Sequence, residues 1–195
     1  MHSHDTSRAA DDARLATAAR MMRSTALLVA AVVLPAMFGA IERHLQDHST
    51  TGWYLANVAA VWLAIPFVFG ALAVGATQAW MVGFVAEMSA LAGFYGYMRF
   101  GENSHEPLHL IAFWTFCGVG AGPIFGLLVH HWRRLRSEFA ALILGGMFVG
   151  EAVLLGLARA RPTTVTALET VAGVLVAVML LAAARWRKRQ TPRRR

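Results

Sequence analysis

The feature that most constrains the fold of this chain is a long stretch without charged side chains. Between Asp47 and Glu87 the sequence contains no Asp, Glu, Lys or Arg. A membrane-spanning helix needs about 20 apolar residues, so this stretch is too long for one span but has the length of two. A short polar interruption at Gly75-Ala76-Thr77-Gln78 divides it. The sequence therefore predicts two consecutive membrane-spanning helices here.

The composition extends this prediction to the whole chain. Hydrophobic residues make up 57% of the 195 residues and charged residues only 15%, which excludes an ordinary soluble domain. The first apolar run is too long for a cleaved signal peptide, so we expect it to stay in the protein. The expected fold class is all-α, a polytopic membrane helix bundle. The apolar runs predict six transmembrane helices, at Ser24–Ile41, Trp53–Val74, Ala79–Met98, Leu108–His131, Phe139–Ala158 and Val165–Ala184.

The basic residues predict how the bundle is oriented. Segments on the cytoplasmic side of a membrane protein carry an excess of Lys and Arg. With both termini in the cytoplasm, 14 of the 18 Lys and Arg residues lie on that side, and only Arg43, Arg99, Arg159 and Arg161 lie outside. We therefore expect a multi-pass protein of the cell membrane with cytoplasmic N- and C-termini.

The two polar ends of the chain are predicted to lie outside the bundle. We expect a disordered cytoplasmic tail at 1–23, a six-helix transmembrane domain at 24–185 and a basic cytoplasmic tail at 186–195. The arginines of the last tail favour anionic lipid headgroups over nucleic acid. The expected partners are the lipid bilayer and either another membrane protein or further copies of this chain.

Two glutamates interrupt the predicted spans. Glu87 lies near the middle of the third span and Glu151 in the second half of the fifth. A charged group at bilayer depth costs roughly 2.5–3.5 kcal/mol, so such residues face a protein interior or a wet cavity. No Lys or Arg lies at a similar depth, and we expect both carboxyls to be uncharged. One interpretation is a site for a proton, cation or polar substrate lined by Asn57, Glu87, Tyr95 and Glu151. The alternative is that hydrogen-bonded carboxyls hold helices together.

The fourth predicted span contains a glycine motif. Gly118, Gly122 and Gly126 recur every four residues, so they share one helix face and let another helix approach closely. Pro123 removes a backbone donor and is expected to kink the span. A kink beside glycines can expose carbonyl groups to a cavity, as in transporter half-helices. Close helix packing explains the same pattern.

Four histidines fall in the predicted outer segments. His44 and His48, like His105 and His109, are four residues apart, and this spacing places two imidazoles on one face of a helix. Together with neighbouring acidic residues they would offer ligands to Zn²⁺, Ni²⁺ or Co²⁺. Pro107 argues against this hypothesis because it is expected to start the fourth helix after His105. The alternative is that the histidines lie apart along the rim, bound to acids or water.

No motif in the sequence identifies a reaction or a cofactor. The chain lacks Gly-x-Ser-x-Gly and Gly-x-x-x-x-Gly-Lys, which support nucleophilic and phosphate chemistry. Residues 105–109 match the pattern His-Glu-x-x-His, but that zinc motif needs one continuous helix, and Pro107 is expected to start a helix after His105. Cys117 is the only cysteine, so the chain forms neither an internal disulfide nor a cysteine-based metal site. The sequence thus favours a non-enzymatic role.

Short motifs cover the second to fifth predicted spans: Leu55-Ala56-Asn57, Trp62, Phe67, Gly70-Ala71-Leu72, Gly93-Phe94-Tyr95, Phe113-Trp114, Gly122-Pro123-Ile124-Phe125-Gly126, and Glu151 after Gly145-Gly146. In these motifs the chain resembles a family of small actinobacterial integral membrane proteins that is catalogued only as a domain of unknown function. Gly-Pro-x-Phe-Gly is the most specific of them. The resemblance implies a six-helix membrane protein and brings no known activity.

More loosely, the predicted arrangement of six helices with both termini in the cytoplasm is similar to that of the substrate-binding components of energy-coupling-factor transporters. Those proteins bind a vitamin or a metal in an outward-facing pocket and contact a partner through Ala-x-x-x-Ala on the first helix. Ala26 and Ala30 match that feature, and the resemblance implies that they pack against another helix. Two hypotheses follow: small-molecule binding or transport through a polar intramembrane pocket, or an accessory subunit whose glycine faces dock a larger membrane complex.

Overall fold

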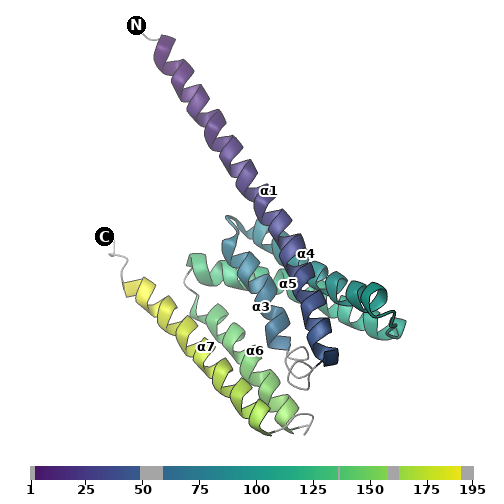
Figure 1. Cartoon of the computed structure of the whole chain (residues 1–195). Helices are drawn as coiled ribbons and strands as arrows, with labels where there is room; N and C mark the ends of the chain where they lie inside the picture. Colours follow the sequence, from purple (N-terminus) through teal and green to yellow (C-terminus); the bar gives the residue numbers. More distant parts are fainter. Residues whose placement is uncertain (1–2, 49–58, 136, 158–162, 190–195) are drawn as a thin grey trace.

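The computed structural model describes residues 3–48, 59–135, 137–157 and 163–189, and this part of the chain is all-α. The all-α prediction is confirmed. Figure 1 shows the helices in chain order. The described residues form six α-helices and one short π-helix: α1 (Ser3–His48), α3 (Ala59–Leu72), α4 (Ala76–Gly96), η1 (Tyr97–Gly101), α5 (Leu108–Leu135), α6 (Glu138–Leu157) and α7 (Thr163–Arg189).

Two helices of the described part are long and apolar enough to cross a membrane, judged by length and composition. They lie within Asp12–His48 and Leu108–Arg134. Three other helices contain shorter apolar stretches, at Val61–Leu72, Glu138–Met147 and Thr170–Ala183. Each of the six predicted spans overlaps a helix, but the start of the second, before Ala59, lies outside the described residues.

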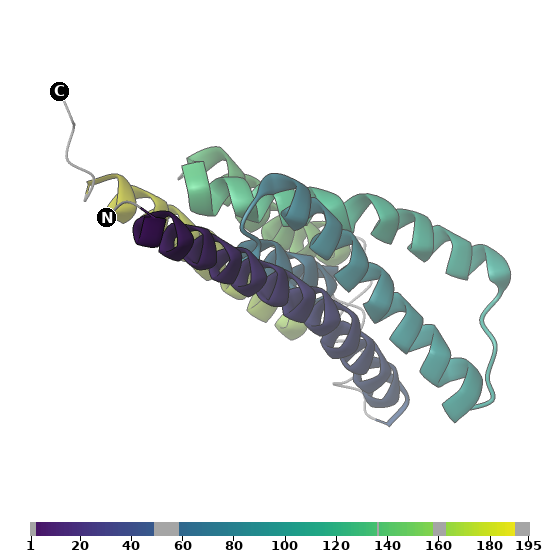
Figure 2. The ribbon, with the colours of Figure 1, turned by 90° about the horizontal axis from the view of Figure 1, so that it is seen from above.

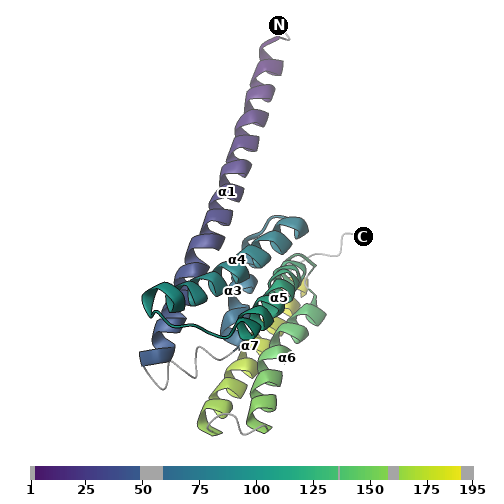
Figure 3. The same cartoon turned by 90° about the vertical axis from the view of Figure 1, so that its right-hand side faces the viewer.

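The first helix is much longer than the predicted first span. We expected a disordered tail at 1–23, whereas the structure continues α1 back to Ser3. Alanine recurs through this segment and has the highest helix propensity. Figures 1 and 3 show that the first half of α1 stands clear of the other helices. At the other terminus, α7 continues to Arg189, inside the predicted tail at 186–195.

The helices pack in two groups. α4 lies between α1 and α5, and α3 packs against α4 and α5. α6 and α7 form a pair that joins the rest through α5 and α3. Figure 2 shows α4 and α5 side by side, connected by the segment that follows η1. One core cluster joins α1, α3 and α4 around Phe69 and Val82, and a second joins α5, α6 and α7 around Phe125 and Leu180.

Polar contacts mark the two ends of the bundle, named here after the predicted orientation. At the inner end, Gln78 accepts a hydrogen bond from the Val74 backbone at 2.8 Å and donates to Ser24 Oγ at 3.3 Å. Arg134 also donates to the carbonyl of Val74 at 2.7 Å. At the outer end, Arg43 of α1 binds Glu102, the residue after η1. α1 and α4 therefore run parallel from one end to the other.

Candidate functional site

Glu87 is buried where α4 meets α5. Its side chain is only 5% exposed, and it follows Ala79 and Gly83 at four-residue spacing on α4. Residues four apart share one helix face, and the small side chains of Ala79 and Gly83 let the backbone of α5 come close. Glu87 thus continues a stripe of small residues and places a carboxyl directly against the neighbouring helix.

The glycines of α5 form the opposite side of this contact. A Cβ atom added to Gly122 would lie 2.7 Å from the carbonyl oxygen of Gly83 and 2.9 Å from Glu87 Cβ. A Cβ on Gly118 would lie 3.3 Å from Glu87 Cγ. A Cβ on Gly126 would meet the backbone carbonyl of Ala79. The predicted glycine face is therefore occupied by α4 of the same chain, and Pro123 lies within this stretch of α5.

The carboxyl of Glu87 is not fully satisfied. Its Oε2 atom is buried and has no hydrogen-bond partner in the described part of the chain. Leaving a buried polar atom unpaired costs about 1–3 kcal/mol, so a purely structural residue at this position would be expected to carry a partner. A buried, incompletely bonded carboxyl is the arrangement expected of a group that gains and loses a ligand.

The other predicted pocket residues are not brought to Glu87 by the described structure. Asn57 lies outside the described residues. Tyr95 is half-buried on α4 and stacks edge-on with Phe94 at 5.3 Å, two helical turns or about 12 Å along the axis from Glu87. Glu151 lies on α6, which packs against α7, α5 and α3, and its side chain is outside what the structure describes.

Ala26 and Ala30 differ in their surroundings. Ala26 is exposed on α1. Ala30 is partly buried and packs against the core cluster that joins α1, α3 and α4. The two alanines therefore do not form one free face for a partner helix.

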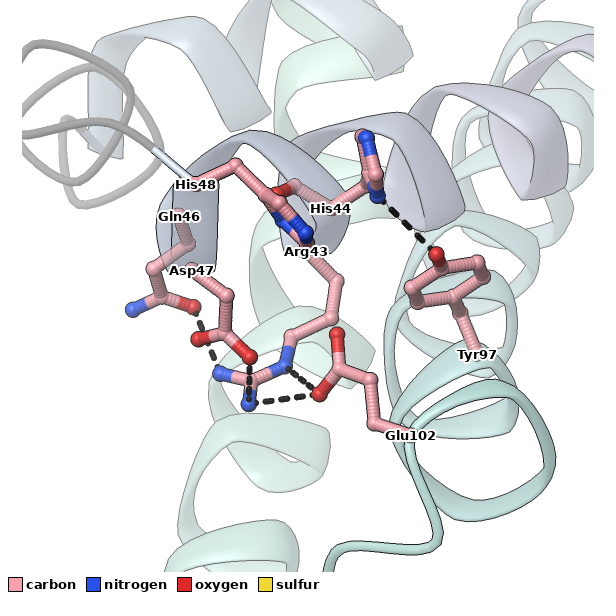
Figure 4. A network of polar contacts seen from close by, with 7 residues as sticks. All are labelled: Arg43, His44, Gln46, Asp47, His48, Tyr97 and Glu102. Atoms are coloured by element: carbon pink, nitrogen blue, oxygen red, sulfur yellow. Dashed lines mark hydrogen bonds and ion pairs between the residues drawn. The ribbon is translucent and has the colours of Figure 1, made fainter.

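A polar network closes the outer end of the contact between α1 and α4 (Figure 4). Arg43 Nε donates to Glu102 Oε2 at 2.8 Å, and Arg43 Nη2 donates to Asp47 Oδ2 at 3.0 Å. Next to this cluster, His44 Nδ1 and the hydroxyl of Tyr97 are hydrogen-bonded at 2.9 Å. The network ties the last turns of α1 to η1, the π-helix that ends α4.

The outer histidines do not assemble into a metal centre. Among the described residues, no group of three or more His, Cys, Asp or Glu side chains could hold a metal ion. His44 and His48 do lie on one face of α1, where their rings stack at 4.1 Å. His105 lies between η1 and α5, whereas His109 is in the first turn of α5, because that helix begins at Leu108 after Pro107.

A second buried carboxyl lies near the outer network. Glu42 is 7% exposed, and its Oε2 atom has no partner among the residues that the structure describes. It lies just beyond the predicted first span. Burial raises the pKa of Glu42 above its ordinary value, because a low-dielectric environment disfavours the charged form.

Sequence reasoning did not identify several of these contacts. Arg43 and Glu102 are 59 positions apart, and no local pattern links them. Gly83 could have been found, because it lies four residues before Glu87 and four after Ala79, as in the motif seen on α5. Gly93 also approaches the backbone of Ala36, and Gly39 that of Ala90, but nothing in the sequence indicates that α1 pairs with α4.

Comparisons with known proteins place the chain in a family without assigning an activity. A model described as a family of unknown function (DUF6518) matches residues 18–193. Searches of the curated proteins and of the solved structures find no match. The match runs from α1 into the residues after α7 and confirms the expected family of unknown function, although it carries no information on membranes or organisms. The chain therefore belongs to the family of unknown function DUF6518.

Proposed function

We propose that this protein is a six-span integral membrane protein, with both ends in the cytoplasm, that binds or transports a small polar molecule or an ion at Glu87. The observation that carries the proposal is the buried carboxyl of Glu87, unpaired at Oε2 and packed against the glycines of α5. Asn57 and Glu151 are proposed to line the rest of the site, whereas Tyr95 lies two helical turns away from Glu87 on the same helix.

Exposed apolar faces support the membrane part of this proposal. Only 17% of the apolar window in α1 and 28% of that in α5 is buried, whereas the core helix of a soluble protein is mostly buried. Large side chains such as Phe116 of α5 and Met179 of α7 remain exposed. Such side chains carry no hydrophobic penalty in the lipid interior of a membrane, because lipid tails are as apolar as they are. The second half of α1 also packs along α4, which makes it part of the fold.

The position of the chain ends supports the predicted topology. In Figures 1 and 3 the start of α1 and the end of α7 point toward the same end of the bundle. This is the end where Arg134 and Gln78 lie. A protein with an even number of spans has both termini on the same side of the membrane. This placement also agrees with the excess of basic residues at that end.

The alternative role as an accessory subunit needs a glycine groove that is open to a partner. On α5, Gly118, Gly122 and Gly126 are instead covered by α4 of the same chain. The unpaired buried carboxyl also has no purpose in a subunit that only fills space. Binding at Glu87 accounts for both observations.

Thermal unfolding of the detergent-solubilised protein tests the proposal. The wild type, Glu87→Gln and the exposed control Asp12→Asn are compared in Na⁺, K⁺, Mg²⁺, primary amines, amino acids and a range of pH. A ligand that binds only the folded state raises the melting temperature by mass action. We expect at least one condition to stabilise the wild type and Asp12→Asn but not Glu87→Gln. Identical responses of all three proteins in every condition would contradict the proposal.

A further inference from the structure

The space around Glu87 limits what can bind there. A Cβ on Gly118 would lie 2.7 Å from both Leu91 Cδ1 and Met88 Cε, and one on Gly122 would lie 2.9 Å from Glu87 Cβ. α4 and α5 are therefore closely packed beside the Cβ and Cγ atoms of Glu87, as is usual in protein interiors. Since Oε2 is also buried from solvent, water or a ligand reaches it only after neighbouring side chains move.

Among the residues that the structure describes, the helices packed around Glu87 bring no cationic side chain near its carboxyl. α1 carries no titratable residue between Arg23 and Glu42, and α3 carries none. α5 carries only Cys117 between His109 and His130, and Cys117 is exposed. On α4 itself the other titratable residue is Tyr95, two turns away. An isolated buried carboxylate is strongly disfavoured over its neutral form.

We propose that the species bound by Glu87 is a proton, exchanged with the solution at the outer end of the bundle. This rests on the proposed function and names its ligand. The step is a reversible protonation, in which the carboxylate takes up H⁺ at one oxygen and no other bond forms or breaks. Proton binding removes the charge that burial disfavours, and it needs no other ligand beside the buried Oε2 atom.

The two halves of the contact between α4 and α5 indicate at which end of the bundle the proton is exchanged. Toward the inner end, Gly83 and Ala79 meet Gly122 and Gly126 backbone to backbone, which leaves no side chain that can move aside. Toward the outer end, the contact at Gly118 is made by the flexible side chains of Leu91 and Met88. Rotamer changes of exposed or partly exposed side chains are fast. The outer half is therefore the half that opens.

Infrared titration of the protein in phosphatidylethanolamine and phosphatidylglycerol vesicles tests this inference. A protonated carboxyl has a C=O stretch that the carboxylate lacks. We expect a band in the wild type that disappears as the pH rises and is absent from Glu87→Gln at every pH. Glu87→Asp keeps a carboxyl and should keep a titrating band at a shifted frequency, which guards against a Gln variant that fails to fold. Asp12→Asn should match the wild type.

Cation additions at fixed pH separate failure of this inference from failure of the proposed function. NaCl, KCl and ethylammonium chloride are added where the carboxyl is protonated, and the proton assignment predicts no loss of the band. Loss of the band on adding one of these cations would overturn the proton assignment but keep Glu87 as a binding site. A wild-type spectrum identical to that of folded Glu87→Gln at every pH, with every cation, would overturn both.

Discussion

Glu87 of α4 lies so close to Gly122 of α5 that a Cβ on the glycine would be 2.9 Å from the Cβ of the glutamate. The contact therefore depends on the absence of a side chain at position 122. It also fixes the depth of the carboxyl, because the neighbouring carbonyl of Gly83 is held 2.7 Å from the same point. The glycine motif of α5 and the glutamate of α4 form one structural unit.

Gly122→Ala should loosen this unit. Overpacking a close-packed contact costs about 1–3 kcal/mol, so we expect a lower melting temperature in detergent. Gly120→Ala is the matched control, because a Cβ there has no atom within 4 Å, and removing a helix glycine stabilises by up to about 1 kcal/mol. Equal destabilisation by the two substitutions would show that the contact between Gly122 and α4 does not cause the loss of stability.

The ion pair between Arg43 and Glu102 should couple α1 to η1 energetically. Their side chains are only 12% and 15% exposed, and the closest N–O distance is 2.7 Å. A double-mutant cycle with Arg43→Ala and Glu102→Gln should give a coupling of about 0.5–3 kcal/mol, the range for residues in one network.

A second ion pair provides the comparison for that cycle. Arg185 and Glu138 lie 3.5 Å apart, with side chains that are 66% and 35% exposed. Surface pairs contribute about 0–1 kcal/mol because solvent screens them. The cycle at Arg185 and Glu138 should therefore give the smaller coupling, and a larger value there than at Arg43 and Glu102 would refute the proposed strength of the outer contact.

Glu42 should make stability depend on pH. Burial raises its pKa above 4.5, so the folded state holds the proton more tightly than the unfolded state. The stability that comes from this tighter proton binding is fully present below pH 4.5. It is lost as the pH rises through the folded-state pKa. Glu42→Gln should flatten the fall in melting temperature on raising the pH, while Asp12→Asn should not. A Glu42→Gln profile parallel to that of the wild type would contradict this assignment.

His44 and His48 should contribute nothing to the binding of divalent metals. His44 Nδ1 is engaged by Tyr97, and His48 Nδ1 donates to the His44 carbonyl at 2.8 Å. Calorimetric titration with Zn²⁺, Ni²⁺ and Co²⁺ should give equal heats for the wild type and a His44→Ala/His48→Ala variant. A heat of binding that disappears in the variant would reveal a metal site that this geometry does not form.

The helices could be predicted from the sequence because apolar runs between polar interruptions are a local signal. The helical start of α1 was missed, since its polarity was interpreted as disorder, while its alanine content favours a helix. Glu87 was visible because a carboxylate among apolar residues is unusual. The spacing of Gly118 and Gly122 predicted a packing face but not its partner, because spacing determines a face and only the tertiary fold determines what covers it.

The outer network was not predictable for a related reason. Arg43 meets Glu102 only because α1 and α4 run parallel with one particular register. A shift of one residue along α1 rotates each side chain by about 100°, which follows from 3.6 residues per turn. Helix registers of this kind depend on the summed packing of many side chains, such as Ala36 against Gly93.

The central claim is that Glu87 is a functional carboxyl reached from the outer side of the membrane. Labelling with a water-soluble carbodiimide, which does not cross the bilayer, tests it directly when intact spheroplasts are compared with inverted vesicles. Mass spectrometry of the peptide that contains Glu87 reports the modification, and denatured protein gives the full signal. The account predicts modification of Glu87 in spheroplasts and far less in inverted vesicles. Modification from the inner side alone, or from neither side while the denatured protein is labelled, would contradict it.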